Sequence, residues 1–141
     1  MQEVLVTVKT VQTDDQGKPD TIELTCEGEY AVKDGAFLIK YKDAFLAGAE
    51  TPISTTIKAS SKGSVTVSRS APYKNRFTLE KGRRCQCLYA TPYGTMSMGF
   101  FGENIENNLN DDGGELKLSY TVDINNSLIS RNEMTINIKK V

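Results

Sequence analysis

The feature that most constrains the fold is the alternation of apolar and polar residues over short runs separated by turn-forming residues. In the clearest run, 115–124, Leu116, Leu118, Tyr120, Val122 and Ile124 fall on one side. Residues two apart point to the same face of a β-strand, so this run predicts a strand with one buried face. Comparable runs occupy residues 3–13, 21–32, 36–42, 53–60, 64–71, 73–81, 85–91, 95–101, 103–109 and 128–140.

The pair Asp34-Gly35 predicts a tight hairpin turn between two of these runs. A two-residue type I′ turn prefers Asp-Gly. It would place Tyr30 opposite Ile39 on the apolar face and Glu29 opposite Lys40 on the other face. A slip of one residue would lose both pairings, so the register is well specified.

A second hairpin places a cation among apolar side chains. If Ser60 faces Ser64, then Ile57 faces Val67 and Thr55 faces Arg69 on the apolar face. One interpretation is that the Arg69 stem packs while its guanidinium reaches solvent or a nearby carboxylate. The other is that Arg69 is an interior cation that receives an anionic ligand group, because guanidinium offers paired donors to carboxylate or phosphate.

The stretch from Cys85 to Phe101 predicts a third hairpin. Pro92 suits the first position of the turn, and Gly94 suits a position with left-handed backbone conformation. Together they favour a three-residue loop. That loop would place Leu88 opposite Met98 on the inner face, together with the pairs Ala90–Met96 and Gln86–Phe100. Cys85, Cys87, Tyr89 and Phe101 would then lie on the other face.

Two other segments complete the pattern. A three-residue turn at 125–127 would place Leu118 opposite Met134 and Tyr120 opposite Asn132, which makes Asn132 a second polar group on the inner face. Residues 43–52 lack strand periodicity and predict a loop with a helical turn, in which Phe45 and Leu46 cover apolar surface.

Composition excludes several classes of function. The 141 residues contain no histidine, which removes the commonest general base and the commonest zinc ligand. We therefore expect no enzyme, no catalytic residues, no metal and no cofactor. The three cysteines, Cys26, Cys85 and Cys87, are expected to be reduced thiols. Their number is odd, and Cys85 and Cys87 lie side by side on one strand face, which is an awkward geometry for a disulfide.

Charge and hydropathy bear on partners and location. The formal charge of −1 argues against nucleic acid. Basic residues at 74, 76, 81, 83 and 84 could form an RNA-facing patch, but alternation explains them better as a solvated strand face. With no run long enough to cross a membrane and no basic start like that of a signal peptide, we expect a cytoplasmic protein without a membrane partner.

These observations predict an all-β fold with one domain spanning residues 1–141. Sequential hairpins favour a single closed up-and-down antiparallel β-barrel over a sandwich, since closure removes exposed sheet edges. The inner residues would either fill the barrel or line a cavity.

The chain also resembles a known family. The segments Thr55-Thr56-Ile57-Lys58, Arg69-Ser70, Thr91-Pro92-Tyr93-Gly94 and Asn132-Glu133-Met134-Thr135-Ile136 occur in an order similar to that of the YwiB-like family of small bacterial proteins of unknown function. The resemblance implies a lipocalin-like, or calycin, barrel. It brings no established activity, substrate or catalytic residue.

The leading functional hypothesis is a non-catalytic barrel that binds a small amphipathic or anionic ligand. Arg69 would hold the anionic end, and the remaining candidate ligand-binding residues are Tyr30, Leu88, Met96, Met98, Phe100, Tyr120 and Asn132. The alternative is a filled barrel that acts as a protein–protein interaction module or homodimer. An exposed apolar patch around Phe101, Tyr89 or the Phe45-Leu46 loop would favour that alternative.

Overall fold

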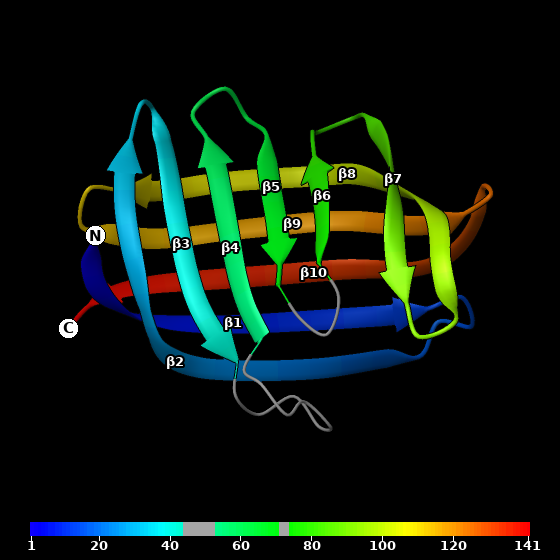
Figure 1. Ribbon diagram of the computed structural model, residues 1–141, viewed down its shortest axis with the longest axis horizontal. Helices are drawn as coiled ribbons and strands as arrows, with labels where there is room; N and C mark the ends of the chain where they lie inside the picture. The colour runs from blue at the N-terminus through cyan, green and yellow to red at the C-terminus, as the bar shows by residue number, and fades with distance from the viewer. Residues whose placement is uncertain (44–52, 71–73) are drawn as a thin grey trace.

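The computed structural model describes residues 1–43, 53–70 and 74–141, and these residues form ten antiparallel strands in one sheet (Figure 1). The strands are β1 (Gln2–Asp14), β2 (Pro19–Lys33), β3 (Ala36–Asp43), β4 (Ile53–Ser60), β5 (Val65–Arg69), β6 (Asn75–Leu79), β7 (Arg84–Thr91), β8 (Gly94–Asn110), β9 (Gly113–Ile124) and β10 (Ser127–Lys140). The all-β antiparallel prediction is confirmed. The two runs expected at 95–101 and 103–109 are one continuous strand, β8.

The sheet curls into a nearly closed, lipocalin-like barrel. Its order is β6-β5-β4-β3-β2-β1-β10-β9-β8-β7, so the first and last strands of the chain are paired in the middle. The long strands β1, β8, β9 and β10 form a layer behind the short strands β3 to β7 and cross them (Figure 1). β6 and β7 meet at the seam, where isolated bridges join Glu80 to Arg83 and Lys81 to Gly102.

The β2–β3 hairpin has the predicted register. Asp34 and Gly35 have φ angles of 52° and 74°, as a type I′ turn requires. Tyr30 is opposite Ile39 and Glu29 is opposite Lys40. The β4–β5 hairpin is also confirmed, with Ile57 opposite Val67 and Thr55 opposite Arg69.

The β9–β10 hairpin reaches the predicted register by a different route. Its turn has two residues, Asn125 and Asn126, both with positive φ, and a bulge follows between Leu128 and Ser130. The bulge supplies the extra residue that a three-residue turn would have supplied. Tyr120 therefore still faces Asn132, and Leu118 faces Met134.

The predicted register of the β7–β8 hairpin is wrong by one residue. Its turn is the two-residue loop Pro92-Tyr93, so Leu88 faces Ser97 and Cys87 faces Met98. A one-residue slip exchanges the two faces of a strand. Leu88 is consequently on the outside, with 74% of its surface exposed.

Gly28 allows close approach where β2 passes from pairing with β1 alone to pairing with β3 as well. A Cβ there would lie 2.6 Å from the carbonyl oxygen of Lys40 and 2.7 Å from Cγ2 of Val6. β2 turns upward along its length in Figure 1, as expected from a glycine opposite Tyr41.

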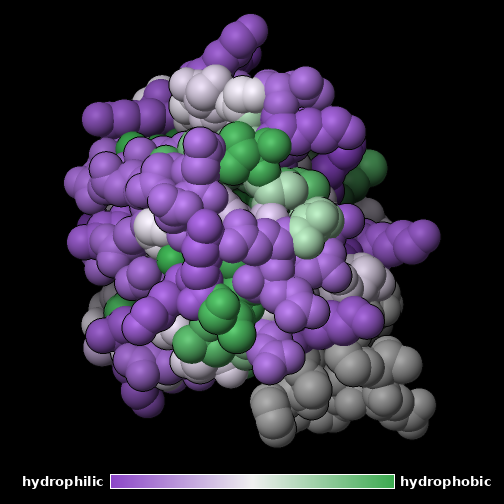
Figure 2. Space-filling model, turned by 90° about the vertical axis from the view of Figure 1, so that its left-hand side faces the viewer, coloured by the Kyte–Doolittle hydropathy of each residue, from purple (hydrophilic) through white to green (hydrophobic). Residues whose placement is uncertain are grey.

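The barrel interior is apolar and well covered towards the chain termini. Fully buried side chains there include Val4, Val6, Ile39, Leu116 and Ile136. The surface at this end is mainly hydrophilic with separated hydrophobic residues (Figure 2). The described residues contain no helix long and apolar enough to cross a membrane. The expected loop at 43–52, with Phe45 and Leu46, falls almost entirely outside the described residues.

Candidate functional site

A row of polar side chains crosses the inner face of the short strands. Register places Tyr41 of β3 beside Thr55 of β4, Thr55 beside Arg69 of β5, and Arg69 beside Asn75 of β6. Tyr41 and Thr55 are buried, and Arg69 is partly exposed at the end of its strand. All four residues lie on the inner face of the sheet, because side chains alternate between the two faces along each strand and these four are in register with the inward apolar residues.

An aromatic cluster lies across the barrel from β6 to β9. The rings of Phe77 and Phe100 stack with centroids 4.4 Å apart, and Tyr120 lies 5.7 Å from Phe77. Tyr89 of β7 lies 6.1 Å from Phe100. The cluster joins both layers of the barrel and supports one side of the polar row.

Tyr120 links the aromatic cluster to the cation. Burial raises the pKa of Tyr120 to about 12, while the positive charge of Arg69 acts in the opposite direction. Tyr89 and Tyr41 also raise the Tyr120 pKa, by smaller effects. The Tyr120 hydroxyl therefore stays protonated at neutral pH and can donate a hydrogen bond. Hereafter Arg69, Tyr41, Tyr89 and Tyr120 are called the arginine–tyrosine cluster.

Asn75 fixes the seam next to this cluster. Its Nδ2 donates to the carbonyl oxygen of Ala90 at 3.1 Å, and its Oδ1 accepts from the Ala90 amide at 2.8 Å. One side chain thus replaces a pair of backbone hydrogen bonds between β6 and β7.

Arg69 differs from the paired arginines of the chain. Arg83, Arg84 and Arg131 each lie within 4.0 Å of a carboxylate. Among residues 1–43, 53–70 and 74–141, no carboxylate forms such a pair with Arg69. Arg69 is partly exposed and lines a depression together with the outward residues Ser68 and Arg76, which fits the interpretation that its guanidinium reaches solvent. A carboxylate partner is not found in the described part of the chain.

Several predicted site residues lie where the sequence places them. Phe100 and Tyr120 are buried in the aromatic cluster, and Asn132 is 5% exposed opposite Tyr120. Asn132 donates to Oγ of Ser130 at 3.1 Å. Met96 and Met98 are half-buried, and Met98 packs against the core.

Two predicted site residues lie elsewhere. Leu88 faces outward because of the shifted β7–β8 register. Tyr30 is buried at the end near the β8–β9 turn, where its hydroxyl donates to the carbonyl oxygen of Asn110 at 2.7 Å. Asn110 is far along β8 from Gly102, the partner of Tyr120, so Tyr30 does not join the cluster.

The sequence hypothesis missed Tyr41 and Tyr89. The signal for Tyr41 was available, because the predicted β2–β3 register places Tyr41 on the same face as Ile39, and Tyr41 lies beside Thr55 in the row that includes Arg69. Tyr89 was placed on the outer face by the same register error that placed Leu88 inside.

The Cys87 thiol shows no sign of nucleophilic activation. Burial raises the pKa of the Cys87 thiol, and the neighbouring Cys85 raises it further. A raised pKa lowers the thiolate fraction at neutral pH. Among the described residues, no group of three Cys, Asp or Glu side chains could hold a metal ion.

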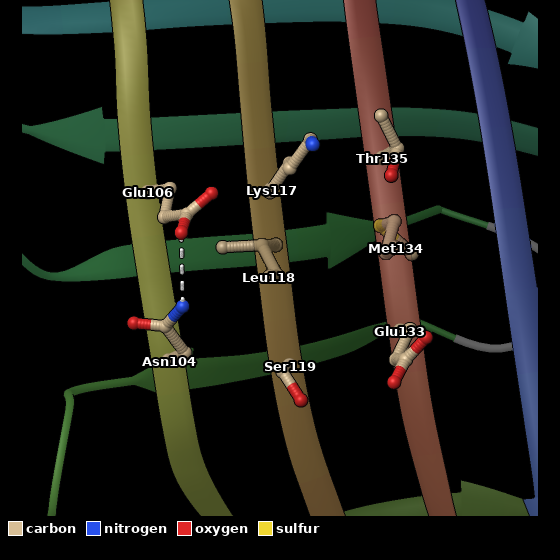
Figure 3. Close-up of a pocket in the computed structure, with 8 residues that line it drawn as sticks. All are labelled: Asn104, Glu106, Lys117, Leu118, Ser119, Glu133, Met134 and Thr135. Atoms are coloured by element: carbon tan, nitrogen blue, oxygen red, sulfur yellow. Dashed lines mark hydrogen bonds between the residues drawn. The ribbon is translucent and has the colours of Figure 1, made fainter.

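A small depression of about 240 Å³ lies on the outer face of β8, β9 and β10 (Figure 3). Glu106, Lys117 and Glu133 contribute charges of both signs, and Asn104 donates to Glu106 at 3.3 Å. Since these groups partly compensate one another, the depression offers no distinct anion or cation site.

Comparison with known proteins gives the family. Residues 6–136 match the model of a domain of unknown function, DUF1934. The chain belongs to this family. A similar solved structure is the crystal structure of the ywiB protein from Bacillus subtilis, with a TM-score of 0.83 and 23% sequence identity. The match covers 99% of this chain and 92% of that chain, and supports the shared fold. No curated protein matches the chain.

Proposed function

We propose that this DUF1934 protein is a non-catalytic binder of a small anionic, amphipathic molecule at the arginine–tyrosine cluster. The observation that carries the proposal is Arg69, a guanidinium on the inner face without an ion-pair partner among the described residues. Arginine binds carboxylate and phosphate groups through paired donors.

The groups around Arg69 suit such a ligand. The neutral hydroxyl of Tyr120 can donate to the same anionic group. Met96 and Met98 are half-buried apolar side chains on the neighbouring ribbon, and methionine adapts readily to ligand shape. Small-ligand sites commonly combine an apolar lining with a few polar groups that fix orientation.

The test uses 8-anilinonaphthalene-1-sulfonate, a fluorescent anionic amphiphile, and the purified chain. Arg69→Gln should weaken its binding about tenfold or more, because a charge-assisted hydrogen-bond pair contributes more than 1.4 kcal/mol. Arg131→Gln is the matched control, since it removes one exposed cation from the outside and should change the affinity less than about twofold.

A retained ligand is the second part of the test. Native mass spectrometry of the chain purified from its own host should show a bound small acid that Arg69→Gln loses. If Arg69→Gln binds the probe as tightly as wild type, with an unchanged circular dichroism spectrum, the proposal is wrong.

The alternative, an interaction module or homodimer, has one observation in its favour. Leu88 and Tyr93, both in the β7–β8 hairpin, are 74% and 94% exposed. Light scattering tests self-association: a dimer that Leu88→Gln converts to a monomer would favour this alternative.

A further inference from the structure

The near-neutral total charge conceals a strong separation of charge along the chain. Residues 36–79 contain seven Lys or Arg and two Asp or Glu, so this segment carries a net charge of +5. The rest of the chain carries −6. The positive segment contains β3 to β6, which stand side by side at the front of Figure 1.

The positive charge gathers on the outer face of these four strands. Lys40 and Lys42 of β3, Lys58 of β4, Arg76 of β6 and Lys74 just before β6 are all exposed. These five residues are called the basic face. Glu29 of β2, opposite Lys40, marks its edge.

Apart from Lys58 and Arg76, all outward residues of β4, β5 and β6 are serine or threonine and carry a hydroxyl group. Register places Thr56 beside Ser68, and Ser68 beside Arg76. Lys58 lies beside Thr66, which lies beside Thr78. Outward positions on these three strands are therefore hydrogen-bond donors, with no apolar side chain among them.

The cations of the basic face also lack acidic partners among the described residues. Six ion pairs are found in that part of the chain, and they involve Lys9, Arg83, Arg84, Lys117, Arg131 and Lys140. None of the six involves the basic face. Elsewhere the described surface compensates many of its cations, whereas here it leaves them available.

A depression of about 450 Å³ lies within this surface. Its described lining consists of the hydroxyl residues Ser54, Thr56, Ser68 and Ser70, the cations Arg69, Lys74 and Arg76, and Asn75. No carboxylate contributes to its described lining. Guanidinium, ammonium and hydroxyl groups together are typical ligands of phosphate oxygens.

We propose that the basic face binds a single-stranded RNA through its phosphate backbone. The sheet spacing spreads the cations over about 14 Å from β3 to β6, wider than one phosphate group. The outward positions of β4 to β6 offer no aromatic side chain on which bases could stack. The contacts therefore go to phosphates, which carry no sequence information, and binding is independent of sequence. A membrane fits less well, because the same positions offer no apolar side chain to enter it.

The expectation of no nucleic-acid partner rested on the total charge and on the alternation that explains basic residues as a solvated strand face. This proposal rests on how the charge is distributed over the folded surface. The two proposals share Arg69, which lines this depression, but the five cations of the basic face do not include it. A different set of variants therefore tests it.

The experiment measures fluorescence anisotropy of a labelled 20-nucleotide RNA of mixed sequence at 50–200 mM salt. Five neutralised phosphates give a slope of log K against log salt of about −3.5. The triple variant Lys58→Gln, Lys74→Gln, Arg76→Gln should reduce the slope to about −1.4 and weaken binding at least tenfold at 50 mM salt.

The control triple is Lys9→Gln, Lys117→Gln, Arg131→Gln. It removes the same charge from β1, β9 and β10, where each cation has a carboxylate partner, and should leave the slope near that of the wild type. Thermal melting of both triples verifies that they are folded. Equal loss in the two triples would show that only total charge acts, which overturns the proposal.

Two competing anions complete the experiment. Polyglutamate and phosphatidylglycerol vesicles should compete poorly with the RNA. Equal binding of either one, or a wild-type slope near zero, would overturn the proposal of an RNA-binding face.

Discussion

At the scale of single residues, Arg84 forms a polar network that depends on the absence of a side chain at Gly99. A Cβ on Gly99 would clash with the guanidinium of Arg84, so the glycine leaves room for that group. Arg84 donates to Asp123 through Nε at 2.9 Å and Nη2 at 2.7 Å, which ties β7 to β9 across β8. Nη1 of Arg84 donates to Gln86 at 3.2 Å.

This network predicts a stability that depends on acid pH. The hydrogen bonds from Arg84 lower the pKa of Asp123 below its ordinary value of 3.8. A lowered folded-state pKa gives stabilisation that is present above pH 3.8 and is lost as the pH falls through the folded value. Asp123→Asn should therefore lower the urea midpoint at pH 6, and the difference from wild type should shrink as the pH falls below 3.8.

The matched control for Asp123 is Glu80→Gln. Glu80 pairs with Arg83 at 3.2 Å, but the Arg83 and Glu80 side chains are 73% and 40% exposed, and such surface pairs contribute about 0–1 kcal/mol. Its urea midpoint should be near wild type at pH 6. A difference between Asp123→Asn and wild type that stays constant from pH 6 to pH 2.5 would contradict the role assigned to the carboxylate.

At the scale of strands, local signals predicted most registers and failed where distant contacts decide. The Asp34-Gly35 turn specifies β2–β3, and alternating side chains specify β4–β5. In β7 both faces carry apolar and polar residues, so alternation cannot choose between them. The choice depends on the seam, where Asn75 of β6 bonds to the backbone of Ala90, a contact that is not visible in a local window.

The candidate site was predictable to the same extent. Arg69 was placed correctly because its hairpin is regular, and Tyr120 because β9 alternates strictly. Tyr89 was missed because its strand has the shifted register. The approach of Asn75 to Ala90 could not be predicted, since it joins two strands that do not form a regular ladder.

The seam gives the prediction at this scale. Asn75→Ala removes both hydrogen bonds to Ala90, which should cost about 1–3 kcal/mol in the free energy of unfolding. The Ala90 amide should exchange its hydrogen faster, because its acceptor at 2.8 Å is lost. Urea unfolding and hydrogen exchange by NMR measure the two effects.

Two further variants make the seam experiment specific. Asn75→Asp keeps an acceptor for the Ala90 amide but loses the donor, so its stability should lie between wild type and Asn75→Ala. Asn104→Ala removes a single exposed hydrogen bond to Glu106 and should be nearly neutral. Unchanged exchange at Ala90 in Asn75→Ala would show that the side chain does not hold the seam.

At the scale of the whole molecule, closure depends on the two ends of the chain. β1 pairs with β10 from Val4–Lys140 to Asp14–Ser130, while the other strand pairs of the ladder are neighbours in sequence. The termini consequently lie near each other at one end of the barrel (Figure 1). Pairing of distant segments slows folding, because loop-closure entropy opposes it.

A circular permutant tests this arrangement. Joining Val141 to Met1 through a short glycine-rich linker and opening the chain between Gln16 and Gly17 turns β10–β1 into a local hairpin. The exposed 15–18 turn contributes few contacts, so the permutant should keep the fold and unfold at a similar urea concentration. Its folding should be faster, since the most distant pairing has become local.

Opening the same joined chain between Lys117 and Leu118 is the matched control. This cut falls inside β9, where Leu118 is 2% exposed and pairs on both sides with Met134 and Ile105. The control should lose cooperative unfolding, whereas the first permutant should retain it. If stopped-flow refolding of the first permutant is no faster than wild type, formation of the β1–β10 pair is not the slow step of folding.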